Sequence, residues 1–449
     1  MAVSFLLLVP PAIGIADNGD FNKMCGRFSL IAEPASAGDA PAFVSLRYVR
    51  DPKAFWVSDN FSTEIALIRA ALSISDLLGS DAFDIRLLGA VHAAFFLAGF
   101  GGLLLVLRRL SDRAAVIAAL LAFFVLGDVC YLSYCSTFFT DAAALAFVFP
   151  AMVCALAIAL HRQCPVWLLV LFAACVCLFS LSKGQHALPA VLLAVYLVIV
   201  ARKRWVIALG LAAAIMASSY LSLSWAPPQE RAQYLFTLVF YKLAPDAQSA
   251  PPVLRELGLP AEYVSYAGMF TYSPAAPMND LVWADQFGQR ISQKQIAAYY
   301  LHHPETVIRL LQFDLHHWAK EMRSVSLGNY PRSAGKPATA LTPLFGWWSS
   351  IRSSLFVIWE FHLPAWYLFV MTFSVKVLRA RQSALAGLLL TVALMGAGEF
   401  LISSLADAGE TARHLLMFHY LTDVSVCLFL LFLATEALAR KKAVKVASW

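Results

Sequence analysis

The hydrophobic positions of this chain fall into long, nearly uninterrupted runs that are separated by polar stretches. Runs of this length match the roughly 20 apolar residues that an α-helix needs to cross about 30 Å of hydrocarbon. The pattern therefore predicts an all-α polytopic membrane protein with about ten transmembrane helices. The expected spans lie near residues 2–16, 84–107, 114–132, 141–160, 165–182, 187–201, 205–225, 353–375, 383–404 and 417–438.

The first of these runs is short and contains Pro10 and Pro11. A signal peptide is one interpretation, but the run lacks the preceding basic residues and a clear small-residue cleavage site. We favour a first transmembrane helix that is short, or that has lost its first turns because the start codon was misassigned.

Short basic clusters next to the apolar runs predict the orientation of the helices, because cytoplasmic loops carry an excess of Lys and Arg. With ten spans, every cluster falls on the cytoplasmic side. Both termini are then expected to be cytoplasmic. The clusters are Arg108, Arg109 and Arg113; Arg162; Arg202, Lys203 and Arg204; Lys376, Arg379 and Arg381; and Arg440, Lys441, Lys442 and Lys445.

The same topology divides the chain into three parts and places three polar segments outside. Periodic apolar residues within these segments predict short helices near 65–78 and amphipathic helices over 292–325, broken at Pro304. The parts are a transmembrane core at 1–225, with outer loops near 17–82 and 131–141; an extracytoplasmic segment of mixed structure at 226–352, between spans seven and eight; and C-terminal transmembrane helices with a cytoplasmic tail at 353–449.

Composition narrows the classes of protein that fit. Hydrophobic residues make up 60% of the 449 positions and charged residues only 14%. Soluble chains contain about 45–50% hydrophobic and about 25% charged residues. A soluble enzyme, a coiled coil, a collagen-like fibre and a disordered tail are therefore excluded. The net charge of +6 comes largely from the clusters that orient helices, and no nucleic-acid partner is expected. Eight cysteines in this length do not form a disulfide framework.

Two outer loops place carboxylates at the level of the membrane surface. Asp17 and Asp20 follow the first span, with Lys23 three positions after Asp20, and Asp141 ends the second loop. Asn-Gly between the first two acids also fits a simple turn, and Asp141 after a Thr also fits a helix N-cap. Ionisable groups at this depth are costly unless they are used, so two such sites on one face favour a functional role.

Cations are expected on the same outer face. Lys183 and His186 lie between the fifth and sixth spans, and Arg413 and His414 lie just before the last span. Arg offers a planar fork to phosphate oxygens, which suits a lipid-linked phosphate. Snorkelling toward lipid headgroups is the alternative for each residue.

Other polar residues suggest no separate chemistry. Adjacent histidines on a helix point about 100° apart, so the pairs at 302–303 and 316–317 do not predict a metal site. Glu399 and Asp423 lie within expected spans and receive no role.

These motifs together resemble the GT-C glycosyltransferases, membrane enzymes that use polyprenyl-phosphate or polyprenyl-diphosphate sugars. The resemblance is closest to bacterial hexose transferases of glycan and cell-surface polysaccharide biosynthesis, and it implies a location in a bacterial inner membrane. The architecture is similar along the whole chain, but the motifs are short. They are Asp17-Asn18-Gly19-Asp20-Phe21, Phe138-Phe139-Thr140-Asp141, His303-Pro304-Glu305 and Leu327-Gly328-Asn329-Tyr330.

The resemblance implies transfer of a hexose, with inversion, from a polyprenyl-phosphate sugar to a glycan or lipid-linked acceptor at the outer membrane face. Asp20 matches the family's first-loop Asp and would act as general base, with Asp17 as the second candidate and Asp141 as the second-loop carboxylate. Asp141 lacks the paired acid of the fuller family pattern, which counts against a bound metal, although a divalent metal (Mg²⁺ or Mn²⁺) stays an open alternative. The implied phosphate ligands are Lys23, Lys183, His186, Arg413 and His414, and the implied acceptor-binding aromatics are Tyr266, Tyr272 and Tyr330.

Two other functions share this layout. A flippase of lipid-linked sugars predicts polar residues inside spans and broken helices in related halves. An O-antigen polymerase or ligase also has many spans, a large outer loop and a catalytic Arg. A transferase should depend on Asp20, whereas a polymerase or ligase should depend mainly on Arg413.

Overall fold

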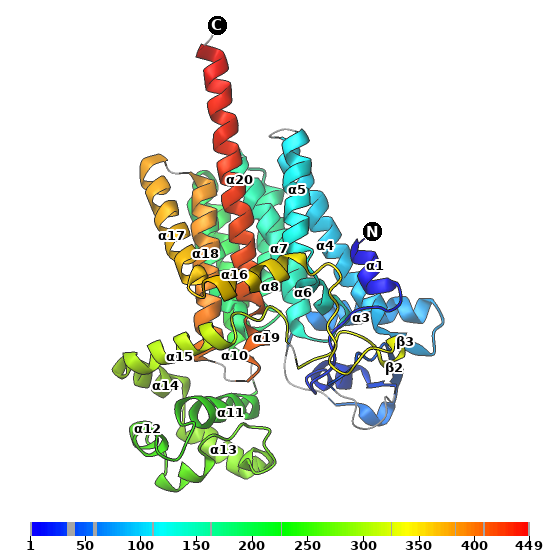
Figure 1. Cartoon of the computed structure of the whole chain (residues 1–449), viewed down its shortest axis with the longest axis vertical. Helices are drawn as coiled ribbons and strands as arrows, with labels where there is room; N and C mark the ends of the chain where they lie inside the picture. The colour runs from blue at the N-terminus through cyan, green and yellow to red at the C-terminus, as the bar shows by residue number, and fades with distance from the viewer. Residues whose placement is uncertain are drawn as a thin grey trace.

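The computed structural model describes residues 2–33, 41–56, 61–109, 112–161, 164–225, 227–324, 326–381, 383–406 and 409–447. Arg162 and the side chains of the C-terminal basic cluster, which helped to predict the orientation, lie outside this description. Most of the described residues are helical, and the helices form a bundle that carries two lobes at one end (Figure 1).

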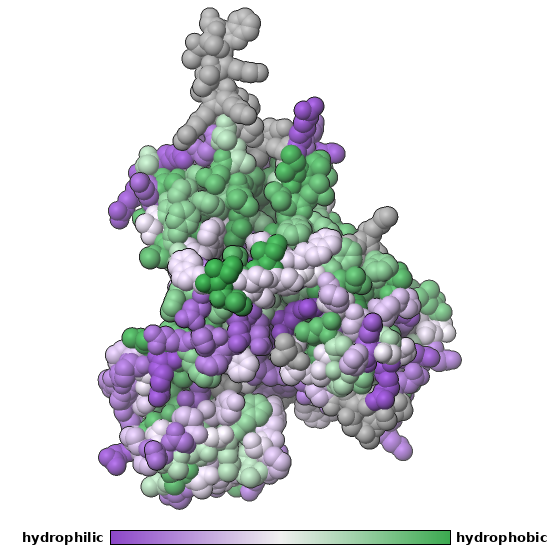
Figure 2. Space-filling model, in the orientation of Figure 1, coloured by the Kyte–Doolittle hydropathy of each residue, from purple (hydrophilic) through white to green (hydrophobic). Residues whose placement is uncertain are grey.

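Long apolar helices build the bundle, and their apolar faces form a belt around its upper half in Figure 2. α7 is the most enclosed of them, and most of its side chains are buried. Its many alanines allow neighbouring helices to approach closely. The bundle helices are α4 (Ile85–Arg108), α5 (Asp112–Leu126), α7 (Thr140–Leu160), α8 (Val166–Ser180), α9 (Ala187–Val200), α10 (Trp205–Ser224), α17 (His362–Arg381), α18 (Ala384–Leu405) and α20 (Leu416–Ala447).

A multi-pass membrane protein is confirmed, but the number of spans is not. Among the described residues, five helices are long and apolar enough to cross a membrane, or seven if each of two bent pairs is one span. Val166–Ser180 and Gly184–Val200 are apolar but shorter. The count of ten therefore stays a prediction.

Three expected spans differ in the structure. The span expected near 114–132 is interrupted after Leu126, and its two helical parts, Ala115–Leu126 and Val129–Ser136, are bent by 59°. The first helix, α1 (Ala2–Leu8), is shorter than predicted, because two consecutive prolines after it cannot continue a helix. The expected eighth span is divided into α16 (Trp347–Ile358) and α17, which are bent by 101°. A helix that ran straight through would bring the ring of Pro364 against the carbonyl of Glu360. α16 therefore crosses the face of the bundle, and only α17 runs along it (Figure 1).

The N-terminal lobe (residues 12–84, as far as they are described) contains a small antiparallel sheet, so the expectation of an all-α protein is wrong here. The strand order is β1-β2-β3, with Ile31 opposite Val49 and Tyr48 opposite Phe83. The predicted short helices near 65–78 form a single helix, α3. The lobe's elements are α2 (Asn22–Cys25), η1 (Gly26–Phe28), β1 (Leu30–Ala32), β2 (Arg47–Arg50), η2 (Pro52–Ala54), α3 (Glu64–Leu77) and β3 (Ala82–Asp84).

The helical lobe (residues 227–317) has a hydrophobic core of its own, built around Phe236, Phe240 and Phe287. The predicted helices with a break at Pro304 are present, but the second ends at His317 and not near residue 325; the proline occupies the first position of α15, where no N–H is needed. The elements are α11 (Pro228–Phe236), the π-helix η6 (Thr237–Leu243), α12 (Ala250–Glu256), η7 (Ala261–Tyr266), η8 (Pro277–Asn279), α13 (Leu281–Arg290), α14 (Gln293–His302) and α15 (Pro304–His317).

Short helical elements connect the bundle helices to one another or to the two lobes. They are α6 (Val129–Leu132), η3 (Ser133–Ser136), η4 (Gly184–His186), η5 (Arg202–Arg204), η9 (Arg332–Ala334) and α19 (Thr411–His414). Three of them carry or adjoin the polar residues that the sequence singled out: η3 precedes Asp141, η4 follows Lys183, and α19 contains Arg413. The candidate site therefore forms where helix ends meet the two lobes.

Candidate functional site

The chain just before the first-loop carboxylates is held by the segment that contains Gly328 and Asn329. The N–H of Gly14 donates to the Asn329 carbonyl (3.2 Å), and the N–H of Ala16 donates to the Gly328 carbonyl (2.9 Å). The Asn329 amide donates in turn to the Gly14 carbonyl (2.8 Å). A Cβ on Gly328 would overlap the carbonyl oxygen of Ala42, so only glycine fits this close approach.

Asp17 shapes the turn that follows. Its Oδ1 accepts the N–H groups of Gly19 (2.7 Å) and Phe21 (3.1 Å), and Gly19 has a φ of +104°, which favours glycine. The Phe21 ring packs edge-on against Phe139 of the second loop (4.8 Å between centroids). Burial raises the pKa of the Asp17 carboxyl, against the lowering effect of those two N–H groups. Asp17 is thus occupied in the turn that presents Asp20.

Asp141 lies in the first turn of α7 and is not its N-cap. The cap position is Phe139, which makes no side-chain cap hydrogen bond. The Asp141 carboxylate is buried, and its two oxygens face two cations: Oδ1 lies 3.2 Å from Lys183 Nζ, and Oδ2 lies 3.4 Å from Arg413 Nη1. The alternative of a simple N-cap for Asp141 is therefore wrong, and its carboxylate is part of a charged cluster.

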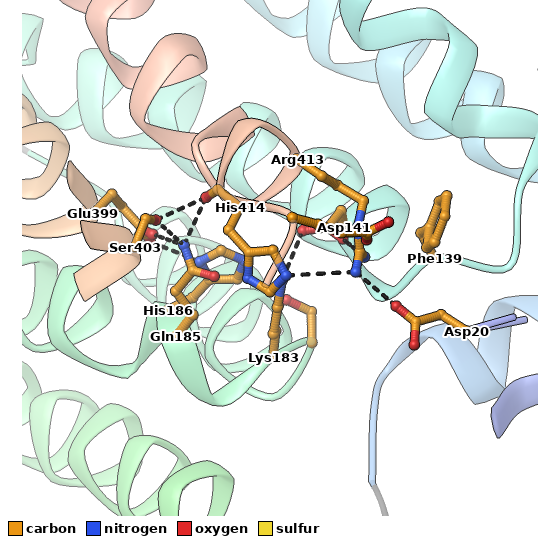
Figure 3. A network of polar contacts seen from close by, with 12 residues as sticks. Asp20, Phe139, Asp141, Lys183, Gln185, His186, Glu399, Ser403, Arg413 and His414 are labelled. Carbon is orange, nitrogen blue, oxygen red and sulfur yellow. Dashed lines mark hydrogen bonds and ion pairs between the residues drawn. The ribbon is translucent and has the colours of Figure 1, made fainter. Parts of the chain in front are cut away.

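Arg413 joins the two predicted carboxylate sites. Its Nη2 lies 2.6 Å from Asp20 Oδ2, and its Nε lies 2.7 Å from Glu410 Oε2. The guanidinium also lies over the Phe139 ring, 4.5 Å from the centroid, and only 7% of the residue is exposed. Figure 3 shows Arg413 between Asp20 and Asp141, which approach it from different segments. Residues 393 positions apart in sequence thus form one cluster.

Opposite charges in this cluster stabilise one another's ionised forms. Burial alone would raise the pKa of the Asp20 carboxyl, but Arg413 and Lys23 outweigh it and hold the pKa below its usual value. The pKa of Lys23 is raised overall, because Tyr234, Asp20 and Glu230 together outweigh the lowering effect of burial. Both groups are therefore charged at neutral pH. Tyr234 and Glu230 belong to the helical lobe, so this lobe faces the cluster.

A second layer of polar contacts lies behind Lys183. His186 Nδ1 lies 2.6 Å from one oxygen of Glu399, and the Gln185 amide donates to the other (2.6 Å). The same amide lies 3.0 Å from the His414 carbonyl, which also accepts from the Ser403 hydroxyl (2.9 Å). Figure 3 shows this chain of contacts leading from Glu399 toward the charged cluster. The backbone beside Arg413 is therefore fixed by α18.

The three predicted acceptor-binding tyrosines lie in different places. Tyr272 is 63% exposed, and its phenol is close enough to Lys23 and Asp20 to interact with them electrostatically. Tyr266 packs against Phe236 and other aromatic rings of the helical lobe's core. Tyr330 is buried beside the N-terminal segment. The structure brings only Tyr272 to the charged cluster.

The carboxylates do not fit a divalent metal. Within the described ranges, no group of three or more His, Cys, Asp or Glu side chains is arranged to hold one. Asp20 and Asp141 are joined by a guanidinium, which occupies the position that a bridging cation would need. The same arrangement suits an anion, because Arg413, Lys23 and Lys183 offer it three positive charges.

Two acids at the site received no role from the sequence. Glu410 is the third carboxylate on Arg413, and Glu399 anchors the layer behind it. Glu399 gave a clear signal, because it is the only charged residue of α18, and an ionisable residue within a membrane helix is by default a functional candidate.

Comparison with known proteins places the chain in a family. The protein-family model described as "YfdI N-terminal transmembrane domain" matches residues 1–447, so the chain belongs to this family. The description agrees with the membrane-spanning architecture. Neither the curated proteins nor the solved structures contain a significant match.

Proposed function

We propose that this member of the YfdI N-terminal transmembrane domain family transfers a hexose from a polyprenyl-phosphate sugar to a cell-surface glycan or lipid-linked acceptor. The observation that supports this proposal most is the position of Arg413 between Asp20 and Asp141, at the lobe-bearing end of an apolar bundle. A lipid-linked donor keeps its isoprenoid in the membrane and its phosphate at the surface. The resemblance to GT-C enzymes supports the same conclusion.

The proposed topology has ten spans in a bacterial inner membrane, with both termini cytoplasmic and the lobes outside. The connections from α4 to α5 and from α17 to α18 lie at the end of the bundle opposite the lobes (Figure 1). Arg108, Arg109 and Arg379 lie beside these connections. Basic residues at that end agree with a cytoplasmic location under the positive-inside rule.

Donor binding activates the base in this proposal. In the structure, Arg413 and Lys183 are neutralised by carboxylates. The donor's phosphate is an anion with the same preference for a guanidinium fork, so it competes with Asp20 and Asp141 for these cations. Asp20 then loses its main stabilising partner and becomes a stronger base. Its low pKa in the resting state ensures that it is ionised and able to accept a proton.

The reaction is a single displacement at the sugar's anomeric carbon. The acceptor oxygen forms a bond to this carbon, while the bond to the phosphate oxygen breaks and its electron pair stays on the polyprenyl phosphate. The acceptor's hydroxyl proton passes to Asp20, and the anomeric configuration inverts. The transition state is oxocarbenium-like, as in glycosidases, and Arg413 and Lys183 stabilise the charge that develops on the phosphate.

Tyr272 marks the acceptor side of the site. Its exposed ring lies on the helical lobe, near Lys23 and Asp20. A sugar acceptor can stack on this ring with its hydroxyl toward Asp20. Tyr266 and Tyr330 are packed elsewhere, so we assign neither of them to the acceptor site.

The test is transfer of radiolabelled hexose from a polyprenyl-phosphate donor by the purified chain in proteoliposomes. Asp20→Asn should reduce turnover by about 10²–10⁴-fold, the usual contribution of a general base. Asp76→Asn is the matched control, because Asp76 forms an exposed ion pair with Arg50 in the same lobe and should leave turnover unchanged.

Two other results would contradict parts of the proposal. Wild-type turnover in Asp20→Asn would show that Asp20 is not the base and would direct attention to Asp141 or Asp17. If the wild-type protein used no donor, the transferase function would be wrong, and the flippase and the polymerase or ligase would become the leading alternatives.

A further inference from the structure

His186 and Glu399 form a buried pair at the back of the site. Neither residue is measurably exposed, and His186 Nδ1 lies 2.6 Å from Glu399 Oε1. The imidazole ring stacks on Phe179, with 4.8 Å between centroids and 15° between planes, and this contact fixes its orientation. Glu399 Oε2 is held by the Gln185 amide. The pair is therefore held by ring packing on the His186 side and by a hydrogen bond on the Glu399 side.

Charge balance determines which nitrogen of His186 carries hydrogen. An unpaired charge in this buried position is strongly unfavourable, so the pair is electrically neutral as a whole. Either a charged imidazolium faces a carboxylate, or a neutral imidazole accepts a proton from a protonated Glu399 at Nδ1. In both arrangements Nε2 carries a hydrogen and acts as a donor.

This donor has no acceptor in the structure. Within the part of the chain that is described, His186 Nε2 is buried and has no hydrogen-bond partner. His186 lies three residues after Lys183 on the η4 turn and is close enough to Asp141 to interact with it electrostatically. Figure 3 shows its ring between Glu399 and the group formed by Lys183, Asp141 and Arg413.

A second buried pair, between Glu64 and His92, provides a comparison. Both residues are fully buried, and His92 Nε2 lies 3.1 Å from Glu64 Oε2. Here the other ring nitrogen is also used, because Nδ1 lies 2.7 Å from the carbonyl of Cys135. A buried Glu–His pair in this protein can therefore satisfy both nitrogens, and His186 differs because its Nε2 has no such partner among the described residues.

We propose that His186 Nε2 donates a hydrogen bond to an anionic phosphate oxygen of the lipid-linked donor and that Glu399 is the positioning residue that holds it there. This inference rests on the proposed function and adds a specific subsite to it. The phosphate is the ligand class that fits, because His186 lies on the turn that follows Lys183 and is within electrostatic reach of Asp141, which pairs with the cations Lys183 and Arg413. A phosphate oxygen accepts hydrogen bonds and carries the negative charge that these cations favour.

The subsite also accounts for the leaving group. As the bond between the anomeric carbon and the phosphate oxygen breaks, the electron pair stays on that oxygen, and the phosphate gains one negative charge. The Nε2 hydrogen bond strengthens as this charge develops. The acceptor's proton passes to Asp20, so no proton has to leave His186 for the reaction to balance.

Binding of farnesyl phosphate to the full chain in detergent, measured by calorimetry, tests the subsite without turnover, and farnesol serves as the uncharged reference ligand. His186→Ala should weaken binding of farnesyl phosphate by about tenfold or more, as expected for loss of a hydrogen bond to a charged group, and leave binding of farnesol unchanged. His186→Gln keeps an N–H donor and should retain part of the affinity.

Turnover separates a positioning role from a structural one. Glu399→Gln should reduce kcat by about 10–100-fold, while Glu64→Gln, which alters the comparison pair, should change it by less than about threefold. Added imidazole should restore part of the activity of His186→Ala by occupying the space of the missing ring. Each variant is first checked for wild-type elution on size exclusion.

The inference is overturned if His186→Ala binds farnesyl phosphate as the wild type does, or if Glu399→Gln loses no more activity than Glu64→Gln. If the wild type binds farnesyl phosphate through His186 but transfers no sugar from any donor, the phosphate subsite stands and the proposed transferase function fails. The two hypotheses are therefore separable.

Discussion

Replacement of Arg413 by lysine tests the central contact of the site while keeping its charge. The guanidinium contacts Asp20 through Nη2, Asp141 through Nη1 and Glu410 through Nε. A lysine ammonium cannot present this planar fork, so it cannot reproduce two parallel hydrogen bonds to a phosphate. One charge-assisted hydrogen bond contributes about 1.5–3 kcal/mol. Its loss corresponds to a decrease of about 10–150-fold in kcat/KM for the donor.

The assay is the initial rate of radiolabelled hexose transfer in proteoliposomes, with the donor concentration varied. Arg381→Lys is a matched control, because Arg381 also pairs with a carboxylate (Glu436, 2.7 Å) and lies over a phenylalanine ring (Phe432, 5.5 Å). It lies at the other end of the bundle and should change kcat/KM by less than about threefold. The reasoning is refuted if Arg413→Lys keeps the wild-type value, or if the control loses as much activity.

Three further predictions follow from the same contacts. The pKa of Asp20 is lowered in the folded protein, so its ion pairs stabilise the fold above the usual pKa of 3.8 and this contribution is lost as the pH falls below that value; the difference in Tm between wild type and Asp20→Asn should be larger at pH 7 than at pH 3. Gly328→Ala should lower the Tm by several degrees because its Cβ has no room, whereas Gly101→Ala, which has open space, should not lower it. Tyr272→Ala should raise the KM for the acceptor by about tenfold and leave that for the donor unchanged, and Tyr220→Ala, at a comparably exposed tyrosine, should alter neither.

The convergence of distant charged residues was predictable because membrane topology acts as a long-range restraint. The ends of helices that emerge on the same side of a membrane lie within one narrow layer, so Asp20, Asp141 and Arg413 were expected on one face. The structure adds the direct contacts between them. Topology restrains only the depth of these residues along the membrane normal. A sequence pattern gives no restraint on their positions within the membrane plane, so it could not show that Arg413 lies between the carboxylates.

The aromatic residues of the long outer segment illustrate what the sequence could not provide. Tyr266 and Tyr272 are six positions apart in a segment rich in aromatics, and both suit a sugar-binding surface equally well. Only tertiary packing separates them, since Tyr266 lies among the rings of the lobe's core and Tyr272 remains exposed. The sequence did not predict that α16 crosses the face of the bundle, and the reason is different. Pro364 indicated a break in the expected eighth span, but the apolar run from which the span was predicted continues across this proline.

The balance of charge explains why proton transfer and donor binding belong together in the proposed mechanism. Three cations (Arg413, Lys23 and Lys183) are ion-paired with three carboxylates (Asp20, Asp141 and Glu410), so these six charges balance one another in the resting site. Neither set would be stable alone in a partly buried position, because desolvated charges need partners. A bound phosphate adds negative charge and leaves a carboxylate without a cation. This excess is most easily removed if the carboxylate takes up a proton, and the acceptor hydroxyl supplies one in the same step. In the proposed mechanism Asp20 therefore becomes a stronger base when the donor is bound, which restricts proton abstraction to the complex that can use it.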